Sequence, residues 1–117
     1  GIAVKCHKDL AVWQKAVDFV SEVYKETDNW PKSEIYGLTS QIRRAAVSVP
    51  SNIAEGAGRG SNKDFARFIN ISLGSLAEIE TQFEIASRLE FIDNTNRYSQ
   101  TLAEIRRMLL GLKNSLG

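Results

Sequence analysis

Residues 95–116, TNRYSQTLAEIRRMLLGLKNSL, carry the most regular apolar pattern in this chain of 117 residues. Large apolar side chains recur there at alternating spacings of four and three residues: Tyr98, Leu102, Ile105, Leu109, Leu112 and Leu116. At about 100° per residue, this spacing places them on one face of an α-helix. The stretch therefore predicts an amphipathic helix that buries one face against other helices, with Asn94 as its N-cap.

Three further segments before this one repeat the helical period, and short breaks of turn-forming residues separate them. The breaks lie at residues 28–31, 56–62 and 93–96. The helices predicted between them cover residues 9–27, 33–58 and 62–89. Connections of only a few residues force neighbouring helices to run antiparallel. The sequence therefore predicts one all-α domain over residues 1–117, an antiparallel up-down-up-down four-helix bundle.

A proline interrupts the second segment but not its apolar phase. The stripe of that segment is Ile35, Leu38, Ile42, Ala45, Val49 and Ile53. Pro50 falls inside it, and an interior proline removes one helical hydrogen bond at a cost of about 3 kcal/mol. We favour one helix kinked at Pro50 over two separate helices, with Ser48 and Ser51 placed to bond the freed backbone groups.

The third segment combines a large apolar stripe with small residues near its middle. The stripe is Phe65, Phe68, Ile69, Ser72, Leu76, Ile79, Phe83 and Ala86, and the small residues are Ser72, Gly74, Ser75 and Ala77. A glycine inside a helix is unfavourable, so the small residues predict a close helix crossing. Ser61, three residues before Asp64, predicts the cap that starts this helix.

The first segment carries two apolar stripes instead of one. One is Leu10, Trp13, Val17, Val20 and Tyr24, and the other is Val12, Ala16, Phe19 and Val23. A helix that is buried on one side needs only one of them. We interpret the second stripe as surplus apolar surface that meets another copy of the chain, with Val12, Phe19 and Val23 as the candidate interface.

Composition excludes several classes of protein. Lys and Arg number 15 against 14 Asp and Glu, so the net charge of +1 gives no bulk attraction to nucleic acid. Cys6 is the only cysteine, which rules out an intrachain disulfide and fits a reducing compartment. No apolar run approaches the roughly 20 residues of a membrane span. We expect a cytoplasmic protein with no membrane partner.

Catalytic and metal-binding patterns are largely missing from the sequence. A metal site inside a helical bundle uses inward Glu and His, but His7 is the only histidine and lies near the N-terminus. We therefore expect no metal, no cofactor, no small-molecule substrate and no enzymatic activity. An enzyme would need a deep pocket lined by Glu55, Glu78 or Glu80 with a raised carboxylate pKa, and we keep that as the least favoured alternative.

Charge is distributed unevenly along the chain. Residues 32–67 hold six basic and three acidic residues, 6 − 3 = +3, whereas residues 78–93 hold one basic and five acidic residues, 1 − 5 = −4. The candidate nucleic-acid-binding residues are Arg43, Arg44, Arg59, Lys63 and Arg67. Such a patch could hold phosphates, pair with the acidic segment of another copy, or form an ordinary solvated face.

Four stretches together resemble a known family. They are HKDLAVWQKA at residues 7–16, YGLTSQIRRAA at 36–46, VSVPSNIAEG at 47–56 and GSLAEIET at 74–81. They resemble the small four-helix proteins encoded by intervening sequences in bacterial 23S rRNA genes. The resemblance implies a ring-like homopentamer. It also implies kinship with the accessory variability protein of diversity-generating retroelements, which binds a reverse transcriptase and nucleic acid.

Two functions follow as hypotheses. The first is a non-enzymatic homo-oligomeric binding module, pentameric by the resemblance, that associates with structured RNA or a nucleoprotein. The alternative is a purely protein–protein scaffold without affinity for nucleic acid. The accessory protein is markedly basic, and this chain departs from it in having a net charge of only +1.

Overall fold

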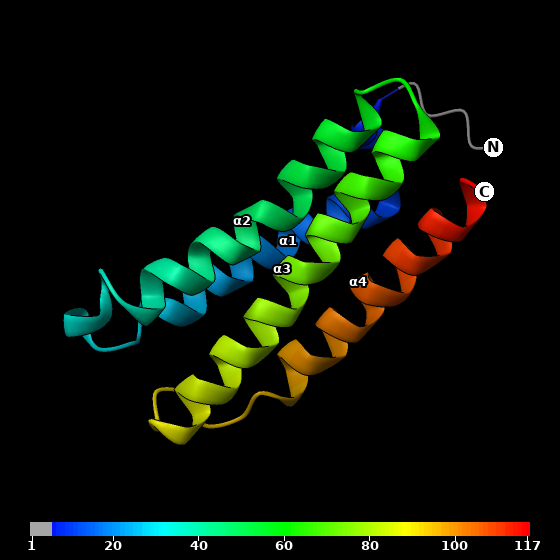
Figure 1. Ribbon diagram of the computed structural model, residues 1–117. Coiled ribbons are helices and arrows are strands. Elements are labelled where there is room, and N and C mark those ends of the chain that lie inside the picture. The colour runs from blue at the N-terminus through cyan, green and yellow to red at the C-terminus, as the bar shows by residue number, and fades with distance from the viewer. Residues whose placement is uncertain (1–5) are drawn as a thin grey trace.

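The computed structural model describes residues 6–117 as an elongated bundle of four helices, 45 × 24 × 19 Å (Figure 1). The helices are α1 (Ala11–Thr27), α2 (Leu38–Ala57), α3 (Asn62–Arg88) and α4 (Asn96–Ser115), with short 3-10 turns at η1 (His7–Asp9) and η2 (Lys32–Glu34). The described part of the chain contains no strand. The predicted all-α, four-helix architecture is confirmed.

The most extensive contact between elements of the bundle joins α2 and α3. Val49 meets Ser72, Ser48 meets Ser75, and Gly56 lies opposite Phe68, so residue numbers rise along one helix as they fall along the other. The chain turns back at each connection, and α1 lies behind α2 and α3 in the view of Figure 1. This arrangement places the α2–α3 turn at one end of the molecule and the α1–α2 and α3–α4 connections at the other.

The predicted helix boundaries hold except at the start of α2, which begins at Leu38 instead of residue 33. The Glu34 carboxylate accepts the N–H of Leu38 at 3.1 Å, so it caps α2 from the preceding turn. Ile35, predicted on the apolar stripe of this helix, is therefore outside it and 51% exposed.

Polar side chains accept N–H groups at the start of α3 and α4. As predicted, the Ser61 hydroxyl accepts the N–H of Asp64 at 3.1 Å. Thr95, not the predicted Asn94, holds the N-cap position of α4. Asn94 instead accepts the N–H of Asn96 through Oδ1 at 2.9 Å.

Pro50 lies inside a single helix, as favoured over two separate ones, and it is buried. Side chains bond the carbonyl groups around it: Asn52 Nδ2 donates to the Ser48 carbonyl at 2.8 Å, and the Ser72 hydroxyl donates to the Val49 carbonyl at 2.9 Å. Ser51 is exposed and takes no part in these contacts. The kink itself stays a prediction.

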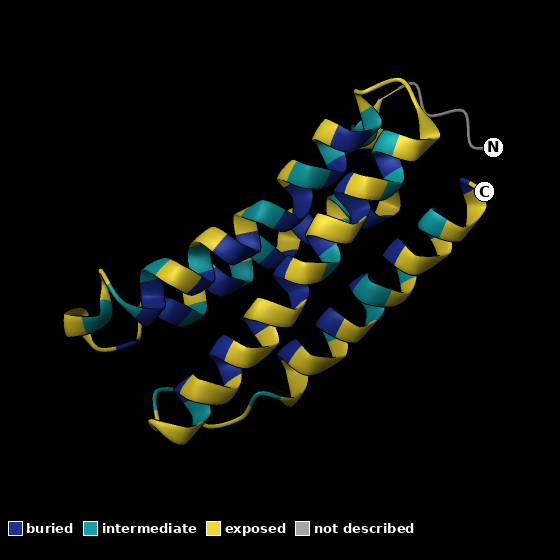
Figure 2. Cartoon of the chain, in the orientation of Figure 1, coloured by how far each residue is buried: buried dark blue, intermediate teal, exposed yellow. Residues whose placement is uncertain are grey.

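The core takes one apolar face from each helix, shown dark blue in Figure 2. All six residues of the predicted α4 stripe are buried. In α3, Ser72 and Ser75 are buried at the crossing with α2, as predicted. Gly74 and Ala77 are exposed, and nothing lies within 4 Å of the position of a Cβ at Gly74, so the crossing does not require that glycine.

The prediction of which apolar stripe of α1 is exposed on the protomer surface is wrong. The inner stripe of α1 (Val12, Ala16, Phe19 and Val23) is fully inside the protomer, with every member at most 4% exposed. Val12, Phe19 and Val23 therefore cannot contact another copy while the bundle is folded. The outer stripe (Leu10, Trp13, Val17, Val20 and Tyr24) is partly exposed, and Val17 and Tyr24 reach 38% and 42%. Sequence periodicity revealed two apolar faces but not which one the neighbouring helices cover.

Candidate nucleic-acid interface

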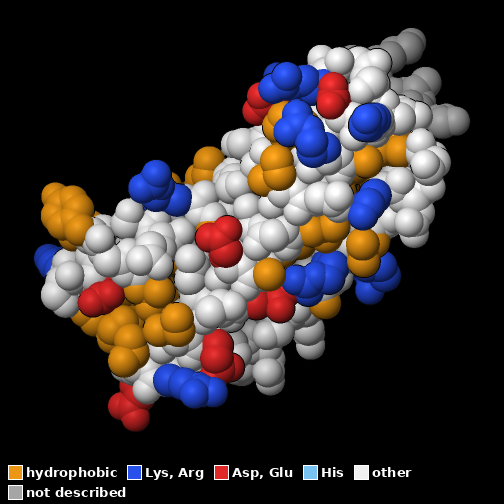
Figure 3. Space-filling model, viewed as in Figure 1, with side chains coloured by type: hydrophobic (Ala, Val, Ile, Leu, Met, Phe, Trp, Pro, Cys, Tyr) orange, Lys and Arg blue, Asp and Glu red, His pale blue; other side chains and the backbone are white. Residues whose placement is uncertain are grey.

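Three of the five predicted cationic residues converge at the α2–α3 turn. The guanidinium carbons of Arg59 and Arg67 lie 4.9 and 4.5 Å from the centroid of the Phe68 ring. This cation–π contact fixes two positive charges against one aromatic ring. Lys63 lies between them in sequence, in the first turn of α3. We call Arg59, Lys63 and Arg67 the cationic turn. In Figure 3, basic side chains gather at this end of the molecule.

The turn is tight because glycine occupies a point where α2 approaches α3 closely. A Cβ at Gly56 would lie 2.8 Å from the Cβ of Phe68, closer than real Cβ atoms come, and 3.1 Å from the Phe65 ring, which is tighter than most contacts. Gly60 adopts a φ of +83°, which glycine accepts without strain. The close approach seats Phe68 against α2, where the ring is 6% exposed.

The local backbone adds to the positive potential. The cationic turn stands where α3 begins, and the free N–H groups at the start of a helix carry partial positive charge. Ser61 satisfies one of them, on Asp64. This geometry suits an anion with several oxygen atoms, such as a phosphate.

Two carboxylates partly balance the cationic turn. Arg59 pairs with Glu55 at 2.7 Å and Arg67 with Asp64 at 3.8 Å. The local balance is therefore 3 − 2 = +1. Both pairs are exposed, and such pairs stabilise a protein by about 0–1 kcal/mol, so a phosphate can replace the carboxylates at little cost. Within residues 6–117, Lys63 forms no ion pair.

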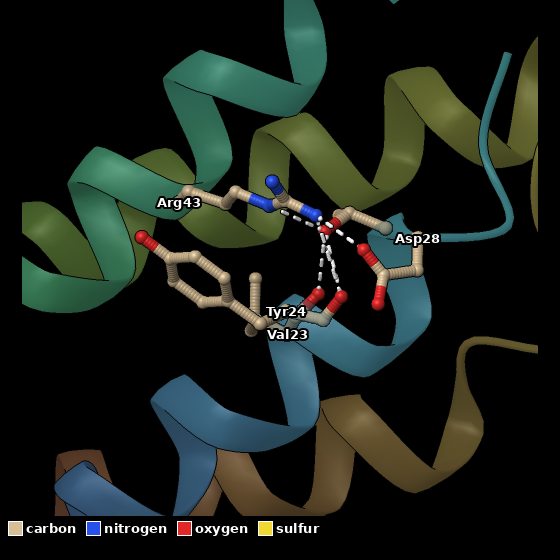
Figure 4. Close-up of polar contacts among 5 residues, drawn as sticks. Val23, Tyr24, Asp28 and Arg43 are labelled. Atoms are coloured by element: carbon tan, nitrogen blue, oxygen red, sulfur yellow. Dashed lines mark hydrogen bonds and ion pairs between the residues drawn. The ribbon is translucent and has the colours of Figure 1, made fainter. Parts of the chain in front are cut away.

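Arg43 lies far from the cationic turn and is occupied inside the protomer (Figure 4). Its Nε donates to the Thr27 hydroxyl at 2.8 Å, and its terminal nitrogen pairs with Asp28 at 3.0 Å. The guanidinium also lies over the Tyr24 ring at 4.6 Å. Arg43 thus joins α2 to the end of α1, and about 24 Å of helix separates it from Arg59. It is not part of the candidate interface.

Arg44 is exposed on α2 but also lies apart from the cationic turn. It lines a groove between α2 and α3 together with Glu78 and Gln82. Of the five predicted residues, three therefore belong to the cationic turn. Arg43 is bonded within the protomer, and Arg44 lines the groove.

The carboxylates of the enzymatic alternative do not share a pocket. Glu55 is exposed and paired with Arg59, and Glu80 pairs with Arg106 of α4. Glu78 lies on α3 about three helical turns from the residues opposite Glu55. The described residues also contain no group of three or more His, Cys, Asp and Glu side chains that could hold a metal ion.

Sequence reasoning missed a polar contact that joins α1 to α4. The Tyr98 hydroxyl donates to Glu26 at 3.0 Å, and the indole N–H of Trp30 donates to the other Glu26 oxygen at 3.2 Å. Burial, with the hydrogen bond to Glu26, raises the pKa of Tyr98 to about 12. Glu26 lies one turn after Glu22 on α1 and carried no sequence signal that would separate it from a solvated residue.

The comparisons with known proteins concern the whole bundle. A family model described as 23S rRNA-intervening sequence protein matches residues 8–111. A crystal structure of a protein with unknown function from the S23 ribosomal protein family of Bacteroides thetaiotaomicron VPI-5482 resembles this chain with a TM-score of 0.80 and 25% identity. The alignment covers 92% of this chain and 98% of that chain.

Neither description names a reaction. No curated protein matches the chain. No helix within residues 6–117 is both long and apolar enough to cross a membrane. Because the family model spans most of the chain and the related crystal structure shares its fold, this chain belongs to the 23S rRNA-intervening sequence protein family.

Proposed function

We propose that this protein is a non-enzymatic, homo-oligomeric binding module that associates with structured RNA through its cationic turn. The observation that carries the proposal is that Arg59 and Arg67 are both held over the Phe68 ring, with Lys63 nearby in the first turn of α3. Arginine binds phosphate through two parallel hydrogen bonds, and a helix start supplies further donors. The family description, which refers to 23S rRNA, supports an RNA partner.

The outer stripe of α1 supports self-association. Its exposed members, Val17 and Tyr24, are large apolar residues beside the partly buried Trp13 and Val20. Val47 of α2, one turn beyond Arg43, is 41% exposed and extends the apolar surface. Burying this surface against other copies is favourable, and the resemblance implies a pentamer.

Oligomerisation would compensate for the weak charge of one protomer. A single cationic turn has a local charge of only +1 once its carboxylates are counted. Five copies in one ring would present five such turns to one RNA, and linked weak contacts bind far more tightly than separate ones. We place the assembly in the cytoplasm, where the exposed Cys6 thiol stays reduced.

The test is the salt dependence of RNA binding. Fluorescence anisotropy with a structured RNA should show binding at about 50 mM salt and clear weakening at about 200 mM. Replacing both Arg59 and Arg67 by Gln should weaken binding and lower the salt slope by about two. The matched control replaces Arg88 and Arg107, both exposed and away from the turn, and should leave the slope unchanged. Absence of binding at about 50 mM salt contradicts the proposal.

A protein–protein scaffold is the second candidate, and the ion pairs of Arg59 and Arg67 favour it because they show that these cations already have partners. It predicts an oligomer of constant mass with no RNA affinity. Light scattering during size-exclusion chromatography, with and without nuclease treatment, separates the two candidates. A mass that falls with nuclease supports RNA association, and an unchanged oligomer that binds no added RNA supports the scaffold.

A further inference from the structure

A polar groove lies between α2 and α3, away from the cationic turn, and encloses about 340 Å³. Its polar lining residues are Gln41, Arg44, Ser48, Ser75, Glu78 and Gln82. Figure 3 looks onto the side of the molecule where these two helices lie in front, and single basic and acidic side chains stand there on a mostly uncharged surface.

The inner wall of the groove holds an acceptor without a donor. Gln82 is 7% exposed, and no hydrogen bond reaches its buried Oε1 from any described residue. Buried polar atoms in proteins nearly always have a partner. This oxygen has almost no exposed surface, so a ligand in the groove does not reach it, and the acceptors that a ligand meets are those of the rim.

The rim of the groove holds one free cation and one free anion. Arg44 and Glu78 are both exposed, and neither forms an ion pair within residues 6–117. The Ser48 and Ser75 hydroxyls lie 2.8 Å apart, and Asn52 also donates to Ser48. One hydroxyl hydrogen of this pair is left without an acceptor, so the groove offers donors as well as acceptors.

The arrangement of hydrogen-bond donors and acceptors in the groove restricts which ligand can bind. A carboxylate repels phosphate, so Glu78 favours RNA only by accepting hydrogen bonds from a base. The two oxygens of the Glu78 carboxylate supply two adjacent acceptors, and Arg44 on the facing helix supplies a donor. The ligand that fits presents two adjacent donors beside one acceptor.

Among the four RNA bases, only guanine has this pattern on its Watson–Crick edge, with N1–H and the N2 amino group as donors and O6 as acceptor. Arginine commonly binds guanine O6 and N7. Bases in single-stranded loops are read on these edges. We propose that the α2–α3 groove binds one unstacked guanine of an RNA loop, an inference that rests on the proposed function.

The groove and the cationic turn can act on one strand. Eleven residues separate Arg67 from Glu78, which is close to three full turns, so both lie on nearly the same face of α3, about 16 Å apart. At about 3.4 Å per stacked nucleotide, roughly five nucleotides span this distance. Phosphates at the cationic turn would thus place a base of the same loop at the groove.

The experiment compares two octanucleotides, oligouridine and the same strand with one central guanosine, by fluorescence anisotropy at about 50 mM salt. The wild-type protein should bind the guanosine strand about tenfold more tightly. Replacing that guanosine with inosine, which lacks the N2 amino group, should reduce the preference. Glu78→Gln should remove it and leave oligouridine binding nearly unchanged.

Two controls separate base recognition from general charge. Glu90→Gln removes an exposed carboxylate outside the groove and should keep the preference. Replacing Arg59 and Arg67 by Gln should weaken both strands equally and keep their ratio.

Several outcomes overturn the guanine site. Equal binding of the two strands by the wild type does so, and so does a Glu78→Gln variant that binds both strands more tightly at an unchanged ratio. A Glu78→Gln variant that changes only the mass of the oligomer would assign the groove to a protein contact instead. In each of these cases RNA binding still stands, whereas failure to bind both octanucleotides and structured RNA removes the proposed function as well.

Discussion

The inner and outer stripes of α1 have similar apolar character, yet the fold uses them differently. Members of the inner stripe are at most 4% exposed, whereas Val17 and Tyr24 of the outer stripe are 38% and 42% exposed. The inner stripe contains Ala16 and two valines, which let helices approach closely. The outer stripe contains Trp13 and Tyr24, whose polar atoms tolerate water. Similar hydrophobicity therefore supports folding on one face and leaves the other available for association.

The largest expected effect tests the inner stripe. Phe19→Ala should lower the free energy of unfolding by about 3–5 kcal/mol, because it leaves a cavity in a packed core. Val17→Ala on the outer stripe should lower it by less than about 0.5 kcal/mol. Urea denaturation of the two variants measures both values. Similar losses in the two variants would mean that the stripes do not differ in burial.

The second effect concerns association. Val17→Glu should keep the helical circular-dichroism spectrum and raise the dissociation constant of the oligomer tenfold or more, because it places a charge in the apolar contact. Light scattering over a dilution series reads this out. Val23→Glu, with its buried site, should unfold the protomer instead. Ala11→Glu, at an exposed position about 120° around the same helix from Val17, is the control, and an unchanged mass for Val17→Glu would exclude the outer stripe as an interface.

A pH-dependent effect tests the contact between the inner stripe and Tyr98 of α4. Tyr98 packs edge-on against Phe19, with ring centroids 6.4 Å apart, and its pKa is raised to about 12. An unfolded tyrosine ionises near pH 10. Between about pH 10 and 12 the folded state therefore holds more protons than the unfolded state, and stability falls as pH rises.

Tyr98→Phe lacks this ionisation. At pH 9 it should be less stable than the wild type by about 0.5–1.5 kcal/mol, the contribution of one hydrogen bond. The difference between the two proteins should shrink as the pH rises to 12, measured by urea midpoints. A constant difference across this range would show that Tyr98 ionises equally in both states.

The last effect, of similar size, concerns the contact between the outer stripe and α2. Arg43→Lys keeps the charge but loses the planar group that bonds Thr27 and Asp28 and covers Tyr24. We expect a loss of about 0.5–1.5 kcal/mol in the free energy of unfolding. Arg44→Lys, exposed on the neighbouring position, should change stability little. Equal values for the two variants would contradict the bonding of Arg43 within the protomer.

Features that depend on residues close in sequence were predictable. The four helices, the α4 stripe and the Ser61 cap follow from local periodicity and capping rules. The location of the cationic turn was also predictable, because Arg59, Lys63 and Arg67 are four residues apart across the start of α3.

Features that depend on distant residues were not predictable. The buried face of α1 is chosen by the helices that pack on it, and Arg43 is occupied by Thr27 and Asp28, sixteen and fifteen residues away. The start of α2 depends on the carboxylate of Glu34 in the preceding turn, and hydrophobic periodicity does not reveal that contact.

The contact between Gly56 and Phe68 links ligand binding to thermal resistance. The Phe68 ring, which lies under both guanidiniums, belongs to the residue that α2 approaches closely at Gly56. An anion that immobilises Arg59 and Arg67 would stabilise the α2–α3 turn. A ligand that binds only the native state raises the melting temperature of the protein. Conversely, Gly56→Ala, which would strengthen an isolated helix, would here push α2 away from Phe68 and separate Arg59 from Arg67.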